Sequence, residues 1–230
     1  MVEQNGRTVL VTGGHGGLGG AVVAEFADAG WRVVTPVRKV GGSTPPGVVE
    51  VAADLTDPAS VTAAVEAAAG EPGSPLRALV NLVGGYGGGR LVHETPVEEF
   101  EQLVSINLRP TFLSTAAALP HLVAAGGGAV VCVSARAAVA PFAKAAGYIA
   151  GKAAVLAFAN SVAVEYKKQG VRSNTILPSV IDTPTNRAAQ PGADFDTWVR
   201  PAEIAAVVRF LASDESAPTS GAAVPVYGQA

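Results

Sequence analysis

Short apolar runs alternate with longer amphipathic segments from one end of the chain to the other. The short runs are rich in Val, Ile and Leu, which is typical of strands buried on both faces. They predict strands at residues 8–12, 31–35, 48–52, 76–83, 129–134, 171–177 and 222–227. The longer segments predict helices at residues 17–29, from 58 onward, and at 96–125, 145–169 and 203–212. This alternation predicts an α/β fold of three layers, in which a doubly wound, mainly parallel, seven-stranded sheet lies between helices.

Punctuating residues support several of these boundaries. Thr56 and Asp57 are suited to cap a helix whose first turn contains Pro58. Gly170 follows the fourth predicted helix and is a typical stop signal. Pro110 lies inside the third predicted helix, where we expect it to bend the axis.

No linker or internal repeat interrupts the pattern, so residues 1–230 are interpreted as a single domain. Parallel sheets bind their ligands beyond the carboxyl ends of the strands. Four residues with candidate roles stand at such ends: Thr12, Asn81, Ser134 and Pro178. The irregular segment at residues 183–199 is a candidate substrate lid.

The composition narrows the choice of partners. The chain has a formal net charge of −3 and no basic run, so a nucleic-acid partner is not expected. Only 15% of its residues are charged, and residues 153–164 are apolar all round, which predicts a homo-oligomer, either a tetramer or a dimer. Cys132 is the single cysteine, and three scattered histidines, His15, His93 and His121, have no ligand spacing, so no metal site is predicted.

The segment at residues 110–135 contains no Asp, Glu, Lys or Arg. Its prolines and its glycines at 126–128 favour a helix, a turn and a buried strand over a membrane span. The first residues lack the pattern of a signal peptide. We therefore expect a cytoplasmic protein that acts on a small molecule and has no membrane partner.

A glycine-rich loop, TGGHGGLG at residues 12–19, stands between the first predicted strand and the first helix. Its glycines Gly13, Gly17 and Gly19 allow the backbone to approach a pyrophosphate, and the helix N-terminus supplies N–H donors. This context predicts a dinucleotide site. His15 could also approach the phosphate, and the alternative is an exposed loop residue.

The end of the second predicted strand bears on the choice of cofactor. NAD-binding folds place an acid there to hold the ribose 2′-hydroxyl, whereas this chain has Val37, followed by Arg38 and Lys39. A guanidinium suits a 2′-phosphate, so we expect NADP(H) to be favoured over NAD(H). The alternative is that both cations are merely solvated. Asp54, after the third strand, could accept from the adenine amino group or hold a turn.

Tyr148 and Lys152 are four residues apart in a predicted helix and therefore share one helix face. An ammonium beside a phenol favours the phenolate, which would let the tyrosine give or take a proton nearer neutral pH. A nucleotide site combined with such a phenol indicates hydride transfer coupled to proton transfer.

These motifs together resemble the short-chain dehydrogenase/reductase family over residues 8–227. The resemblance implies a Rossmann-type fold and an NAD(P)(H)-dependent oxidoreductase. The motifs that carry it are TGGHGGLG, Asp54-Leu55, Asn81-Leu82-Val83-Gly84, Asn107, Tyr148-x-x-x-Lys152 and Pro178. With the residue pattern, it gives as candidate cofactor-binding residues Gly13, His15, Gly17, Leu18, Gly19, Arg38, Asp54, Leu55, Asn81, Val83, Gly84, Tyr148, Lys152, Pro178, Ile181 and Thr183.

The resemblance also implies a mechanism. Tyr148 protonates a carbonyl oxygen or deprotonates an alcohol, Lys152 lowers the tyrosine pKa and holds the nicotinamide ribose, and Asn107 anchors a water chain. The family's serine lies about thirteen residues before the tyrosine, which falls on Ala135. Either Ser134 fills the role, or the serine is lost and Arg136 or a loop group polarises the substrate oxygen.

A narrower resemblance links the lid segment and the glycine-aromatic loop at residues 84–89 to quinonoid dihydropteridine reductase. That branch dispenses with the serine, which fits Ala135, but it has an acid at the position of Val37 and lacks the asparagine at 107. A pterin-type reductase is therefore one alternative, and a non-catalytic nucleotide-binding protein is another.

The substrate itself is not identified by the sequence. Tyr86 and Trp198 could flank a flat substrate, because aromatic faces stack on planar rings. Arg136 is a third candidate substrate residue, since it could contact an acidic group.

Overall fold

The computed structural model describes residues 6–41 and 44–229. Its sheet has seven strands in the order β3-β2-β1-β4-β5-β6-β7, and every pairing between them is parallel. The strands are β1 (Thr8–Thr12), β2 (Arg32–Val37), β3 (Val48–Ala52), β4 (Leu76–Asn81), β5 (Gly128–Val133), β6 (Val171–Pro178) and β7 (Ala223–Val226). The order reverses between β1 and β4, where doubly wound sheets open a ligand crevice.

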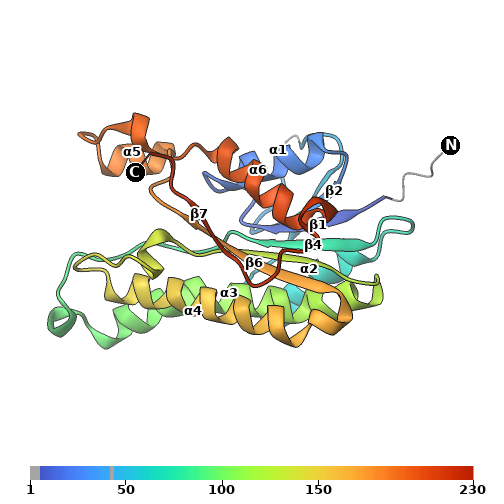
Figure 1. Ribbon diagram of the computed structural model, residues 1–230, viewed down its shortest axis with the longest axis horizontal. Helices are drawn as coiled ribbons and strands as arrows, with labels where there is room; N and C mark the ends of the chain where they lie inside the picture. Colours follow the sequence, from blue (N-terminus) through green and yellow to red (C-terminus); the bar gives the residue numbers. More distant parts are fainter. Residues whose placement is uncertain (1–5, 42–43, 230) are drawn as a thin grey trace.

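Helices cover both faces of the sheet (Figure 1). The helices are α1 (Gly19–Asp28), α2 (Pro58–Ala69), α3 (Val97–Ala124), α4 (Ala146–Glu165), α5 (Pro184–Ala189) and α6 (Pro201–Ala212). Short 3₁₀ turns, η1 to η5, lie at Val92–Glu94, Arg136–Ala138, Lys167–Gln169, Phe195–Thr197 and Asp214–Ser216. The predicted three-layer, doubly wound α/β fold is confirmed.

Each face of the sheet has its own hydrophobic core. Under α1 and α6, the fully buried Phe26 and Ile204 pack with side chains of β1 such as Val9. Under α2, α3 and α4, Leu79 and Leu122 form the second core. Burying one such side chain contributes roughly 2 kcal/mol, so the alternation of apolar runs in the sequence is enough to set the layers.

The second strand is longer than predicted because it continues through Pro36. In β2 the amide of Arg32 bonds toward β1 and that of Val33 toward β3, so Pro36 has its nitrogen on the β1 side. The pairing with β1 has already ended at Val34. Proline therefore removes no ladder bond here, which is why it does not end the strand.

The fourth predicted helix is divided in the structure. Helix α4 ends at Glu165, and the turn η3 follows it up to Gly170, whose φ of 74° is left-handed. Gly170 thus ends the segment as predicted. Asp57 caps α2 by accepting from the Ser60 amide, which confirms that predicted helix start. Helix α3 runs on through both Pro110 and Pro120.

Helix α4 is, within the described residues, the one helix long and apolar enough to cross a membrane by length and composition. Its buried side chains, among them Val155, Ala159 and Val162, belong to the core beneath α2, α3 and α4. A helix packed in this way is a core helix of the fold, and it is also the helix that carries Tyr148 and Lys152.

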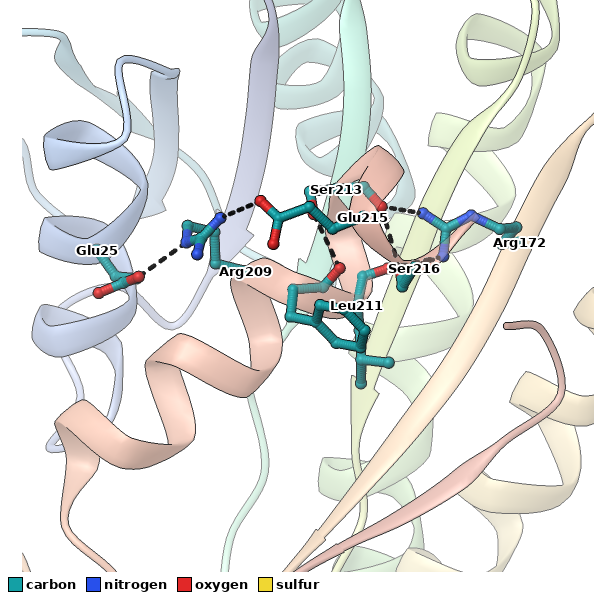
Figure 2. A network of polar contacts seen from close by, with 8 residues as sticks. Glu25, Arg172, Arg209, Leu211, Ser213, Glu215 and Ser216 are labelled. Carbon is teal, nitrogen blue, oxygen red and sulfur yellow. Dashed lines mark hydrogen bonds and ion pairs between the residues drawn. The ribbon is translucent and has the colours of Figure 1, made fainter. Parts of the chain in front are cut away.

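Three arginines near the amino ends of strands bond to the carboxyl ends of helices. Arg32 donates to the carbonyls of Ala67 and Ala68 in α2, and Arg77 donates to Ala125 after α3. Figure 2 shows the third, Arg172, which donates to Leu211 and Ser213 at the end of α6 and to the hydroxyl of Ser216. Each guanidinium satisfies carbonyls that a helix end leaves unpaired and lies at the negative end of the helix dipole.

Candidate active site

The glycine loop joins β1 to α1 as the sequence predicts. A side chain at Gly19 would collide with the backbone of Gly13 and Gly14, so the loop is closed tightly against the start of α1. Leu18, at the position before the helix, is almost buried. Gly16 and Gly17 before the helix and Gly20 in its first turn are exposed, so this end of α1 offers backbone to a pyrophosphate.

The loop lies close to two other predicted cofactor residues. A Cβ built on Gly13 would lie 3.3 Å from Cγ2 of Val83, which follows β4. A Cβ built on Gly17 would lie 2.7 Å from Cγ2 of Thr183, at the start of the lid. The structure therefore brings together the glycine loop, the β4 end and the lid, which are far apart in the sequence.

Arg38 and Asp54 line a cavity of about 560 Å³ with Ala52, Thr56 and Ser60. Asp54 accepts from both the amide and the hydroxyl of Thr56, and these two bonds, more than the charge of Arg38, lower the pKa of its carboxyl. Asp54 thus holds a turn, which was one of its two predicted roles, while it also faces the cavity. The predicted Leu55 is partly buried against the second core.

Lys152 is buried in α4, with 7% of its surface exposed. Its Nζ donates to the backbone carbonyl of Val133 at 3.0 Å, at the end of β5. Burial lowers the pKa of the ammonium to about 8. Because the Val133 carbonyl is neutral, it does not compensate the charge of the ammonium, which is available to a ligand at the carboxyl edge of the sheet.

Tyr148 is half-buried in the first turn of the same helix. Burial, and after it the neighbouring Tyr86, raises the pKa of its phenol. The prediction that Lys152 lowers the tyrosine pKa is therefore wrong for this structure, because the ammonium is directed at the Val133 carbonyl. A phenol with a raised pKa is protonated at neutral pH and is able to donate its proton.

Asn107 is fully buried in α3 and grips the loop that follows β4. Its Nδ2 donates to the carbonyls of Gly85 and Leu103, and its Oδ1 accepts from the Gly85 amide. A Cβ built on Gly84 would lie 2.5 Å from Asn107 Oδ1 and 3.0 Å from Lys152 Nζ. Only glycine leaves room where Asn107 and Lys152 converge.

Ser134 does not face this cluster. It is 2% exposed, and its hydroxyl donates to the backbone carbonyl of Lys152 at 2.6 Å. The hydroxyl hydrogen is used within the fold, so the expectation that Ser134 polarises a substrate oxygen is not supported. The position thirteen residues before Tyr148 is occupied by Ala135, which offers no side-chain donor.

Asn81 lies deeper than a ligand contact, since it is 2% exposed and donates to Thr115 and weakly to the sulfur of Cys132. Its Oδ1 is buried without a partner among the described residues. Cys132 is fully buried, as predicted, and burial raises the pKa of its thiol to about 12. Pro178 ends β6 as predicted.

The lid begins with a set of local contacts. Thr183 accepts from the Asn186 amide and so caps α5, while Asp182 forms a two-bond ion pair with Arg187. Ile181 forms a β-bridge with Val199 and ties the two ends of the lid together.

Two of the three candidate substrate residues face outward. Tyr86 is 69% exposed, and its ring packs edge-on against the ring of Tyr148, with centroids 5.2 Å apart. Arg136 lies 4.9 Å from the ring centroid of Tyr227. Trp198, by contrast, is 7% exposed and packs against Phe195, so the structure gives it a packing role rather than the predicted place beside a substrate.

Sequence reasoning missed Glu50. This residue of β3 bonds to His15 of the glycine loop, with Oε1 and Nε2 2.6 Å apart, and its side chain is only 7% exposed. The available signal was an acid inside the apolar strand VVEVA, because a carboxylate is seldom buried unless it is paired.

Comparisons with known proteins agree with this geometry. A model of the family described as short chain dehydrogenase matches residues 7–194. The chain is 32% identical to 2-(R)-hydroxypropyl-CoM dehydrogenase of Xanthobacter autotrophicus, over 96% of this chain and 97% of that protein. It is 34% identical to the 3-oxoacyl-[acyl-carrier-protein] reductase MabA of Mycobacterium bovis, over 96% of this chain and 92% of that protein.

Solved structures show the same fold. The ligand-free aldohexose dehydrogenase of Thermoplasma acidophilum superposes with a TM-score of 0.88 and 26% identity, over 98% of this chain and 94% of that one. The structure of ElxO with NADP bound superposes with a TM-score of 0.89 and 23% identity, over 97% and 98%. The chain belongs to the short-chain dehydrogenase/reductase family and is an NAD(P)-dependent oxidoreductase of small substrates.

Proposed function

We propose that Tyr148 is the acid and base of this oxidoreductase, acting on a small carbonyl or alcohol. The observation that carries the proposal is that Lys152 and Asn107 converge on Gly84 in the loop after β4, while Tyr148 packs against Tyr86 of the same loop. When bound, the nicotinamide supplies or accepts the hydride. The chain's own residues supply the proton and hold the reactants.

The raised pKa of Tyr148 suits the reductive direction. A protonated phenol donates its hydrogen to a carbonyl oxygen as that oxygen gains negative charge. Lys152, buried in the next turn of α4, holds the nicotinamide ribose in this proposal. Asn107 positions the backbone of Gly85 and anchors the water that returns the proton.

The residues at the other end of the site fit a dinucleotide. The glycine loop leaves room for a pyrophosphate, and Arg38 and Asp54 face one cavity, where the adenosine end is held in doubly wound folds. Val37 in place of an acid and the exposed Arg38 support NADP(H) over NAD(H). His15, Asp54, Thr183 and the loop glycines complete the proposed cofactor contacts.

On the substrate side we assign Tyr86 and Arg136, which are both exposed. Tyr86 packs against Tyr148 in the first turn of α4, and Arg136 follows the end of β5. The segment at residues 183–199 is the lid in this proposal, and the whole chain acts as one domain. The lid touches the glycine loop through Thr183, so lid position and cofactor binding are coupled.

A pterin-type reductase is the second candidate function. It is favoured by the orientation of Ser134 and by Ala135, since that branch dispenses with the serine. The cofactor residues weigh against it, because Val37 stands at the end of β2 where that branch has an acid.

Homo-oligomerisation is supported by apolar side chains on the outer face of α3 and α4. Ile106, Phe112 and Val164 are 44%, 51% and 78% exposed, and Phe112 packs edge-on against Phe158. A second copy would cover this face in a dimer, and the edge strand β7 with Phe210 offers a second surface for a tetramer. Light scattering at micromolar concentration, with Phe112→Glu as the disrupting variant, tests it. A cytoplasmic location remains a prediction.

The central test is a screen for NADPH consumption with aromatic ketones, acyl thioesters and quinonoid pterins, using the wild type and Tyr148→Phe. We expect the variant to lose about a thousandfold in kcat on every active compound while it still binds NADPH. Equal rates for the two proteins on all active compounds would refute the role of Tyr148. Activity confined to the pterins would select the second candidate.

A further inference from the structure

Glu50 is a buried carboxylate that the proposed chemistry does not use. It lies in β3 opposite Thr35 of β2, and its side chain is 7% exposed. A buried carboxylate is unfavourable unless hydrogen-bond donors satisfy it. The donors here come from two different loops: His15 Nε2 of the glycine loop, 2.6 Å away, and the backbone N–H of Gly41 after β2, 3.3 Å away.

These contacts place Glu50 beneath the ribose end of the proposed cofactor site. The sheet order is β3-β2-β1, so the loop after β1 must cross the end of β2 to reach Glu50 in β3. The crossing is close, because a side chain at Gly14 would collide with the hydroxyl of Thr35. The carboxyl end of β2 is where dinucleotide folds hold the adenosine ribose. Arg38 and Lys39 directly follow β2, and His15 reaches across its end to Glu50.

The contact also fixes the chemistry of the imidazole. A carboxylate only accepts hydrogen bonds, so Nε2 of His15 carries the shared proton. The other nitrogen, Nδ1, is then the one left for a ligand, and 60% of the His15 side chain is exposed. When the ring is protonated, Nδ1–H is a charged donor, and a phosphate accepts from it more strongly than a ribose hydroxyl does.

We propose that Glu50 is a specificity-determining residue for the cofactor, which holds His15 in position as a second recognition group, beside Arg38, for the 2′-phosphate of NADP(H). This inference rests on the proposed use of a nicotinamide dinucleotide at the glycine loop. Glu50 acts through His15 and Gly41 rather than by touching the cofactor, so it is a positioning residue. It follows that the discrimination between NADPH and NADH depends on the pair and not on Arg38 alone.

The experiment measures binding instead of turnover. The dissociation constants of NADPH and NADH are determined by isothermal titration calorimetry for the wild type, Glu50→Gln, His15→Asn and the double variant. We expect either single change to raise the Kd of NADPH about tenfold, the size of one lost charged hydrogen bond, and that of NADH by less than about threefold. The double variant should match the single ones, since both remove the same contact.

Glu215→Gln is the matched control, because Glu215 is also paired with a basic side chain, Arg209, but on the helix α6 side of the molecule (Figure 2). Equal losses for both cofactors would overturn the proposal, as would additive effects in the double variant. Tighter NADPH binding in Glu50→Gln would also overturn it, because the carboxylate would then oppose the phosphate.

A failure of the proposal on Glu50 can be told apart from misfolding and from a failure of the NADP(H) assignment. If Glu50→Gln does not fold in a thermal unfolding assay, His15→Asn carries the test, since its side chain is largely exposed. A wild type that prefers NADH would refute the assignment of NADP(H), whereas the proposal on Glu50 is judged by how the ratio of the two constants changes. Neither result depends on Tyr148.

Discussion

At the amino ends of the strands, Arg32, Arg77 and Arg172 donate to backbone carbonyls at the ends of three helices. At the carboxyl ends, Lys152 and Asn107 also bond to backbone, but they do so around Gly84. The first set links one secondary-structure element to another. Lys152 and Asn107 instead converge on Gly84, where a larger residue would not fit.

This difference separates stability from function within one fold. A guanidinium at the amino edge has its donors taken up by carbonyls, so changing it should affect unfolding and not chemistry. The ammonium of Lys152 is almost fully buried and, within the described residues, donates to one acceptor, the carbonyl of Val133; burial lowers its pKa to about 8. Such a group is unfavourable for stability and available for a reaction.

The largest expected effect is at the amino edge. Arg172→Met removes the bonds to Leu211, Ser213 and Ser216, and we expect the free energy of unfolding in urea to fall by about 3 kcal/mol. The kcat of the folded protein should stay unchanged, because the residue is at the opposite end of the strands from Tyr148. A loss below about 1 kcal/mol would mean that water replaces the guanidinium and that the amino edge is not specially stabilised.

The next effect is at the carboxyl edge. Gly84→Ala places a Cβ 2.5 Å from Asn107 Oδ1 and 3.0 Å from Lys152 Nζ, so both side chains must shift. We expect kcat to fall about a hundredfold, as for a displacement of about 1 Å in a catalytic group. Gly20→Ala in α1 is the matched control, because its Cβ would meet nothing within 4 Å. Similar kcat values for the two variants would contradict the assigned site.

A smaller effect concerns pH. Burial lowers the pKa of Lys152 to about 8, below its usual value of 10.5, so between these two values the unfolded chain binds more protons than the folded one. Stability from this group therefore rises with pH across that window. Relative to Lys152→Met, the wild type should gain about 2 kcal/mol in unfolding free energy from pH 8 to 9.5. If the unfolding free energies of the two proteins change equally with pH, the pKa of Lys152 is not lowered in the folded protein.

The smallest effect is expected for the other arginine of Figure 2. Arg209 pairs with Glu25 and Glu215, and all three side chains are at least 27% exposed. Arg209→Met should lower the unfolding free energy by less than about 1 kcal/mol, as exposed ion pairs do. If Arg209→Met lowered the unfolding free energy as much as Arg172→Met does, bonds to backbone carbonyls would stabilise the fold no more than exposed ion pairs.

Several predictions from sequence were confirmed because their causes are local. The strands follow from apolar runs, the cap at Asp57 from the residue before Pro58, and the stop at Gly170 from its left-handed backbone. The second strand was predicted to end at Thr35, but it continues through Pro36 to Val37. The proline is accepted because the pairing of β2 with β1 has already ended at Val34.

The site was predicted in part, for the same reason. The loop glycines and the Tyr148–Lys152 spacing are sequence-local, and both motifs reach the carboxyl edge. The orientation of Ser134 is decided by a contact with the carbonyl of Lys152 in α4. The pairing of His15 with Glu50 joins residues 35 positions apart, and no spacing rule links a loop histidine to an acid in a later strand.

By itself, the sequence determined the α/β alternation, the glycine loop and the helix that carries the tyrosine and lysine, because each depends on neighbours along the chain. The protonation states and charges of those residues depend on the fold. Burial raises the pKa of Tyr148 and lowers that of Lys152. Glu50 is covered because His15 of the glycine loop lies over it. Burial depends on what several elements place around a group, and a pattern along one chain does not contain that information.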